Sequence, residues 1–287
     1  MRALLALLLL APVAVAQTAA EKKATLAFIE SLRDKDTGAF KVTPDGKPSL
    51  RACNGAAKAI KVLGGELADK DKVSKFVLGC YDEKAGTFAD PGTKADVAST
   101  AIGVIVACEL GIPKDKFKGA MDYLGKNAKE FEDVRIAAAA VEAWGVKDCP
   151  FDLKPWIVIG TDFAKVKTHG PRETGSGWAL ALRLGAVPTA ADKSAAMLVM
   201  GLFQDDDDGG WKKAGAKASD IETTYRVMRA LMLLKESPKD EKYLREFLAT
   251  HRNKDGGSAT EPGKASSMSG VYYTAIIAKW LDDMAKK

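Results

Sequence analysis

Apolar residues recur along this chain at positions i, i+3, i+4 and i+7, as in KATLAFIESLRDK at 23–35 and STAIGVIVACELG at 99–111. This spacing places the apolar side chains on one side of an α-helix. The strict alternation of apolar and polar residues that marks β-strands is missing throughout. The hydrophobic pattern therefore predicts an all-α protein.

The predicted helices come in pairs, and a glycine-containing turn follows the first member of a pair. The turn appears as TGAF at 37–40, AGTF at 85–88, DGGW at 208–211 and DGGS at 255–258. Two weaker copies, FKGAMDYLGKN with DVRIAAAAVEAWG and LKPWIVIGTDFAK with PRETGSGWALALRLG, fill the middle of the chain. We therefore expect one domain over 17–287, made of six helix-pair repeats. Their expected ranges are about 22–68, 69–115, 116–147, 150–190, 191–238 and 239–287.

The two helices of a pair differ in composition. A pair cannot bury its apolar side alone, so neighbouring pairs must stack on one another. The second helices are poor in charge and rich in Ala, Gly and Val, as expected for an inner layer that is packed on both sides. The first helices carry more Lys, Asp and Glu, which suits a solvated outer layer. Six such pairs favour closure into an α/α toroid.

Composition and charge narrow the class of protein. With 47% hydrophobic residues and interspersed charges of both signs, the chain is typical of a globular protein. A net charge of +5 is mild, and no block of basic residues interleaves with aromatic ones. We therefore expect no nucleic-acid partner.

The N-terminal residues resemble a signal for export. Arg2 precedes the apolar run ALLALLLLAPVAVA at 3–16, which ends in the small-x-small pattern of a cleavage site. We expect residues 1–16 to be a signal peptide, cleavage after Ala16, and a secreted or periplasmic mature chain without a membrane span. An exported chain can oxidise its cysteines, but three of them fall in apolar helical runs where buried free thiols are common. The redox state stays open for Cys53, Cys80, Cys108 and Cys149.

The repeat resembles that of the prenyltransferase and terpene-cyclase toroids. The segment VSKFVLGCYDEKAGTFADPGTKADVASTAIGVIVACELG at 73–111 is similar to a zinc-histidine repeat in the β subunit of Rab geranylgeranyltransferase. The segment GAFKVTPDGKPSLRACNGAAKAIKVLG at 38–64 resembles the repeat that precedes it. The resemblance covers essentially the whole mature chain and implies the α/α toroid fold.

The resemblance also implies where a zinc site would lie. Protein prenyltransferases hold zinc with an Asp-x-Cys pair and a His at the starts of two successive inner helices. In this chain those positions fall on Ser49, Arg51 and Ser99. A guanidinium is no zinc ligand, so no metal and no cofactor is expected in this frame. The two histidines, His169 and His251, are expected at the surface rather than in a catalytic pair.

A second alignment frame places polar residues in the fifth repeat. Here Lys217 falls on a diphosphate-binding lysine, Asp220 on the zinc aspartate and Glu222 on the zinc cysteine of the family. The two carboxylates are weak candidates for holding Mg²⁺. The simpler interpretation is that they cap and stabilise the start of a helix. With Asp133 and Glu173 they are also expected to form an acidic rim at one mouth of the ring, which weighs against a prenyl diphosphate.

Aromatic residues gather on the inner helices of the last three repeats. Trp178, Tyr225, Tyr272 and Tyr273 lie there, whereas the first three repeats offer mainly small and aliphatic residues. A one-sided aromatic wall is consistent with a groove for an isoprenoid and equally with ordinary core filling.

Two functions follow from these observations. In the first, the toroid is an exported binding module for a hydrophobic ligand or a partner peptide, without zinc-dependent catalysis. In the alternative, it is a divergent protein geranylgeranyltransferase that transfers a prenyl group to a cysteine thiol, with Zn or Mg as its cofactor. Under either hypothesis the candidate ligand-binding residues are Lys217, Asp220, Glu222, Glu173, Trp178, Tyr225 and Tyr272.

Overall fold

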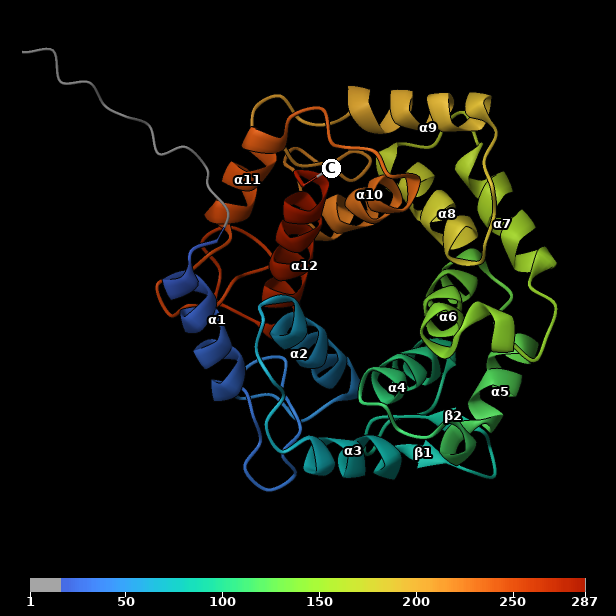
Figure 1. Ribbon diagram of the computed structural model, residues 1–287, viewed down its shortest axis with the longest axis vertical. Helices are drawn as coiled ribbons and strands as arrows, with labels where there is room; N and C mark the ends of the chain where they lie inside the picture. The colour runs from blue at the N-terminus through green and yellow to red at the C-terminus, as the bar shows by residue number, and fades with distance from the viewer. Residues whose placement is uncertain (1–16, 287) are drawn as a thin grey trace, which may run out of the picture.

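The computed structural model describes residues 17–286, and over this range the chain forms a ring of helix pairs (Figure 1). The predicted signal peptide lies outside the described residues. The inner layer of the ring consists of α2 (Leu50–Val62), α4 (Val97–Glu109), α6 (Phe131–Trp144), α8 (Pro171–Arg183), α10 (Ile221–Leu234) and α12 (Met268–Met284). The outer layer consists of α1 (Ala19–Ser31), α3 (Lys70–Gly79), α5 (Gly119–Asn127), α7 (Lys154–Ala164), α9 (Ala190–Leu202) and α11 (Glu241–Thr250). The predicted α/α toroid is confirmed.

Each inner helix packs against the next one in the sequence, and α12 returns to α2 so that the ring closes (Figure 1). The hydrophobic core lies between the two layers, where the aromatic residues of the turns are completely buried. Phe40, Phe88 and Trp211 all belong to this set. None of the described helices is long and apolar enough to cross a membrane.

The glycine turns form short antiparallel pairings that the sequence pattern did not predict. At AGTF, β1 (Tyr81–Asp82) pairs with β2 (Thr87–Phe88). Single bridges join Arg33 to Phe40 and Gln204 to Trp211 at the matching turns. Pairings of one or two residues are too short to produce an alternating pattern, which explains why they were missed. Two short 3-10 turns, η1 (Lys114–Phe117) and η2 (Val146–Asp148), complete the described elements.

The turn glycines hold neighbouring repeats together. Gly86 and Gly256 both have positive φ, of 67° and 85°. A Cβ at Gly86 would lie 2.7 Å from the carbonyl oxygen of Gly119 at the start of α5, and one at Gly256 would lie 2.6 Å from that of Ala24 in α1. The last repeat thus packs on the first helix through the same contact that joins successive repeats, and this contact helps to close the ring.

Several inner helices begin with a capping side chain. The oxygen of the N-cap residue accepts a hydrogen bond from the backbone N–H three positions later, at 2.6 to 3.2 Å. Such a cap is typically worth about 1 kcal/mol. The capping residues of α2, α4, α10 and α12 are Ser49, Asp96, Asp220 and Ser267.

All four cysteines are free. Cys53 and Cys80 are buried, and burial raises the pKa of each thiol to about 12. A thiol with such a pKa stays protonated at neutral pH and is a poor nucleophile.

Candidate functional site

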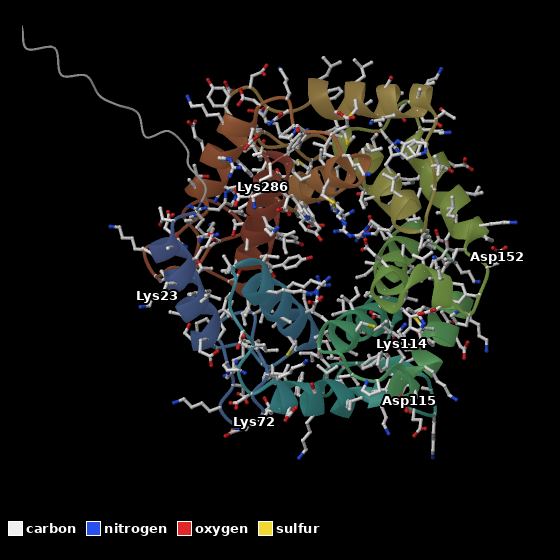
Figure 2. All side chains as sticks on the ribbon, viewed as in Figure 1. Lys23, Lys72, Lys114, Asp115, Asp152 and Lys286 are labelled. Carbon is white, nitrogen blue, oxygen red and sulfur yellow. The ribbon has the colours of Figure 1, made fainter. Side chains whose placement is uncertain are left out.

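A cavity of about 640 Å³ lies in the middle of the ring and is lined by the inner helices. Figure 2 shows nitrogen-tipped side chains that reach into this central space, whereas labelled lysines such as Lys23 and Lys72 extend outward from the outer layer. Basic side chains outnumber acidic ones in the lining. The basic ones are Arg51, Lys58, Lys61, Arg135, Arg183, Arg226 and Arg229, and the acidic ones are Glu109, Glu142 and Glu222.

One layer of ion pairs joins the first halves of α6, α8 and α10. Arg226 on α10 contacts Glu132 on α6 at 2.8 Å and Glu222 on its own helix at 2.7 Å. Arg172 on α8 reaches Glu222 at 3.1 Å, and Arg135 reaches Glu132 at 2.7 Å. These contacts connect helices that lie far apart in the sequence and fix the mouth of the cavity at this end.

A second layer joins the later halves of the same three helices. Glu142 on α6 accepts from Arg229 on α10 at 2.5 Å, and its carboxylate lies 3.3 Å from Nε of Arg183 on α8. The Arg183 side chain is only 9% exposed and that of Arg229 is 16% exposed. Lys58 on α2 also lines the cavity, and burial lowers its pKa. This layer carries more positive than negative charge.

An aromatic cluster covers the wall formed by α10 and α12. The hydroxyl groups of Tyr225 and Tyr272 lie 2.7 Å apart. The Tyr225 ring centroid is 5.1 Å from that of Tyr273 and 5.2 Å from that of Trp280. The guanidinium of Arg229 lies 5.5 Å from the Trp280 ring centroid, at the distance of a cation–π contact. The cavity therefore has an aromatic wall directly beside its cationic groups.

The structure brings only some of the predicted site residues to this cavity. Tyr225, Tyr272 and Glu222 line it. Lys217 is exposed in the loop before α10, and Glu173 lies in the first turn of α8 outside the lining.

Two further candidates lie in the wall of the ring. Trp178 is 2% exposed and packs in the core between the layers, away from the lining. Asp220 also lies outside the lining, and its Oδ1 accepts a hydrogen bond from the Thr223 backbone at 2.8 Å as the cap of α10.

The side chains at the zinc positions implied by the family resemblance do not fit zinc. Ser49 caps α2, and the Ser99 hydroxyl lies 2.7 Å from the Asp96 carboxylate in the capping box of α4. Arg51 lines the cavity as a cation. Two hydroxyls and a guanidinium are not the thiolate, imidazole and carboxylate donors that zinc takes. Over residues 17–286, no group of His, Cys, Asp and Glu side chains is arranged to hold a metal ion.

Three expectations from the sequence are wrong. The acidic rim does not form, because Glu222 pairs with Arg226 and Arg172 at a mouth that also contains Arg51 and Arg135. The inner layer is not packed on both sides, since one side of its helices lines the cavity and carries the charges found there. His251 is not at the surface, because it is 1% exposed and its Nδ1 lies 2.9 Å from the Phe247 carbonyl oxygen.

The sequence pattern did not reveal four residues that dominate the cavity, namely Lys58, Glu142, Arg183 and Arg229. Each one interrupts an apolar inner helix, for example Lys58 in NGAAKAIKV and Arg183 in WALALRLG. The sequence did contain a signal for these residues, because each is a charged residue in an otherwise apolar inner helix.

Comparisons with known proteins place this geometry among related folds. The family model described as Prenyltransferase alpha-alpha toroid domain matches residues 1–133 and 178–287. No curated protein matches the sequence. The structure is similar to that of the apo type II terpene cyclase MstE from Scytonema, with a TM-score of 0.63 and 12% identity over 94% of this chain and 98% of that chain.

Two other solved structures are similar at somewhat lower TM-scores. A variant of MstE in complex with merosterolic acid A, its product, has a TM-score of 0.59 and 14% identity over 94% of this chain and 97% of that chain. A protein from Actinoplanes has a TM-score of 0.55 and 14% identity over 93% of this chain and 99% of that chain. At these identities the similarity shows the fold.

Proposed function

This chain belongs to the prenyltransferase alpha-alpha toroid domain family, and from that premise we propose that it is a binding protein whose central cavity holds a small amphipathic ligand. The observation that carries the proposal is the cavity of about 640 Å³ with charged and aromatic walls. Small-molecule sites typically measure about 300–1,000 Å³. This volume favours a small molecule over the partner peptide that the sequence left open.

The two kinds of wall favour an amphipathic ligand over a purely apolar one. Ile102, Ile105, Ile136 and Tyr273 offer apolar surface, whereas the arginines and Lys58 offer charge. A purely apolar ligand would displace water from the cations without pairing them, at a cost in binding free energy. A ligand with an apolar body and a polar end satisfies both walls. The complex of the structural neighbour MstE with merosterolic acid A supports a ligand of this class.

To test the proposal, we would block the cavity by Ala139→Phe. Ala139 lines the cavity from α6, so the phenyl group fills part of the space that a ligand needs. We expect the affinity for dodecanoate, measured by isothermal titration calorimetry, to fall at least about tenfold. Native mass spectrometry of the wild type would show any ligand that co-purifies.

The matched control is Ala195→Phe, because Ala195 is exposed on the outer helix α9. This variant should bind as the wild type does. Equal affinities of all three proteins would contradict the proposal, and so would a wild type that binds no twelve-carbon probe, whether its head group is an alcohol, a carboxylate or a phosphate.

We further propose that the protein acts without zinc. The side chains at the expected zinc positions, Ser49 and Ser99, are engaged in helix capping, and Glu222 is held in two ion pairs. Metal analysis of the purified protein after incubation with Zn²⁺ is expected to find well below one zinc per chain. One tightly held zinc per chain would favour the alternative prenyltransferase activity, and the specific resemblance to the geranylgeranyltransferase β subunit stays a prediction until then.

Export also stays a proposal. It is supported by the charged start, apolar run and cleavage pattern of residues 1–16. Cell fractionation with N-terminal sequencing tests it, and a mature chain that begins at Gln17 outside the cytoplasm is the expected result.

A further inference from the structure

The later halves of the inner helices hold positive charge that the protein itself does not neutralise. Lys58, Arg183 and Arg229 line this part of the cavity, and Glu142 is the carboxylate that contacts the two arginines. Lys58 forms no ion pair within residues 17–286, where the acidic groups of the lining pair with other cations. The other two acidic groups of the lining are already paired, Glu109 with Lys61 and Glu222 with Arg226.

Polar atoms in the same region lack hydrogen-bond partners. Nε of Arg183 and Nε of Arg229 are buried and make no hydrogen bond in the described part of the chain, although Nε of Arg183 lies 3.3 Å from the Glu142 carboxylate. Arg183 is the more telling of the two, because its side chain is nine-tenths buried and still lines the cavity. A buried donor without an acceptor is costly, and buried charges are usually paired. The two arginines share the single carboxylate of Glu142, so an anionic group in the cavity would supply the negative charge that they lack.

The tyrosine pair adds a further donor beside the cations. One of the two hydroxyl protons is used in the 2.7 Å hydrogen bond between Tyr225 and Tyr272. The other proton has no acceptor among the described hydrogen bonds and is available to a ligand. Burial by itself raises the pKa of Tyr225, but the charges of Arg229, Arg183 and Lys58 outweigh it and lower the pKa.

We infer that Lys58, Arg183 and Arg229, together with the Tyr225–Tyr272 hydroxyl pair, bind the oxyanion head, a carboxylate or phosphate, of the ligand in the central cavity. This inference rests on the proposed function, because it names the part of the cavity that holds the polar end. Guanidinium, ammonium and phenol donors match the several acceptor positions of an oxyanion. The apolar body of the ligand would then lie between Ile102 and Ile105 on α4 and the aromatic wall of α10 and α12.

Three probes with the same twelve-carbon chain separate the head group from the tail. Dodecanol, dodecanoate and dodecyl phosphate are titrated into the wild-type protein below their micelle concentrations. We expect at least one of the two anions to bind at least about tenfold more tightly than dodecanol. The preferred anion distinguishes a carboxylate ligand from a phosphate ligand.

Variants then test the named side chains. Lys58→Met and, independently, Arg183→Met are expected to weaken binding of the preferred anion about tenfold or more and to leave dodecanol binding unchanged. The control is Lys61→Met, because Lys61 lines the same cavity but pairs with Glu109 and its side chain is 74% exposed. Thermal unfolding of each variant shows whether the fold is intact. If Arg183→Met fails to fold, Lys58→Met still tests the site, because Lys58 forms no ion pair among the described residues.

The outcomes separate the two proposals. If dodecanol binds as tightly as both anions, or if Lys58→Met and Lys61→Met behave alike, the oxyanion site is wrong and the cavity still binds ligands. If none of the three probes binds to the wild type, the proposed function fails and the oxyanion site fails with it.

Discussion

At the scale of single residues, this protein is distinguished by charged side chains that face the inside of a ring. Arg226 and Arg229 follow one another by one helical turn on α10 and pair with Glu132 and Glu142, respectively, on α6. These pairs connect residues 94 and 87 positions apart in the chain. Each links two inner helices, so its loss should affect the stability of the ring as well as the cavity.

Glu132 offers a test of this connection through pH. Burial by itself raises the pKa of Glu132, but hydrogen bonds and charges from Arg226 and Arg135 outweigh it and lower the pKa from 4.5 to about 2. Because the pKa is lower in the folded than in the unfolded chain, the stabilisation is complete above about pH 4.5 and is lost as the pH falls towards 2. We expect Glu132→Gln to lower the free energy of unfolding by about 1 kcal/mol at neutral pH, a value reduced for the exposure of the side chain.

Urea unfolding of wild type and variant at neutral pH and near pH 2 measures this effect, and the two proteins should converge at the lower pH. The control is Glu130→Gln, because Glu130 precedes α6 without a side-chain capping bond. It should change stability by less than about 0.5 kcal/mol. An equal loss in both variants would show that the ion pairs of Glu132 contribute nothing specific.

At the scale of elements, the packing of a turn against its inner helix depends on a missing side chain. Gly103 lies in the middle of α4, where a Cβ would overlap the ring of Phe88 in β2. Alanine is normally the better helix former by about 1 kcal/mol. Here the close approach of the buried aromatic ring decides the residue, against local helix propensity.

Gly103→Ala is therefore expected to destabilise the protein by about 2–3 kcal/mol, because Phe88 must move out of its packed position. Denaturant unfolding followed by circular dichroism measures the change. Gly201→Ala is the matched control, since Gly201 lies in α9 with no neighbouring atom within 4 Å of the added methyl group. The free energy of unfolding of this variant should rise by up to about 1 kcal/mol. A neutral result at Gly103 would mean that the turn does not hold α4 in this way.

At the scale of the whole molecule, the ring closes by repeating a local contact. Gly86 packs its turn on α5, Gly209 packs on α11 at Tyr243, and Gly256 packs on α1 at Ala24. An open array of repeats would leave the last turn without a partner and let the terminal repeats unfold separately. In the closed ring, α1 is the partner of the last turn.

The closing contact can be tested by Gly256→Ala. The methyl group would collide with the Ala24 carbonyl, and the positive φ adds strain, so we expect a loss of about 3 kcal/mol or more in the free energy of unfolding. The control is Gly263→Ala, because Gly263 has a similar φ of 76° and no atom within 4 Å. This variant should lose only the part of the free energy of unfolding that comes from backbone strain, about 1–2 kcal/mol. Equal losses in the two variants would show that the contact with α1 adds nothing to closure.

The sequence by itself determined the helices, their pairing and the closed ring. Helical periodicity indicates which side of each segment is buried. The recurrence of GAF, GTF and GGW turns indicates that one unit is repeated. These signals are local, so they are read without knowing which repeats touch across the ring. Tyr225 and Tyr272 were found in the same way, as aromatic residues on inner helices.

Only the tertiary structure decided the character of the cavity. A charge on a helix surface has the same pattern whether it faces solvent or the inside of a ring, and its partner lies on another repeat. For this reason Lys58, Arg183 and Glu142 were missed, and Glu222 was assigned to an acidic rim although Arg172 lies 3.1 Å away from it. Local periodicity encodes the architecture, whereas the chemistry of the cavity depends on distances between repeats that exist only once the ring has closed.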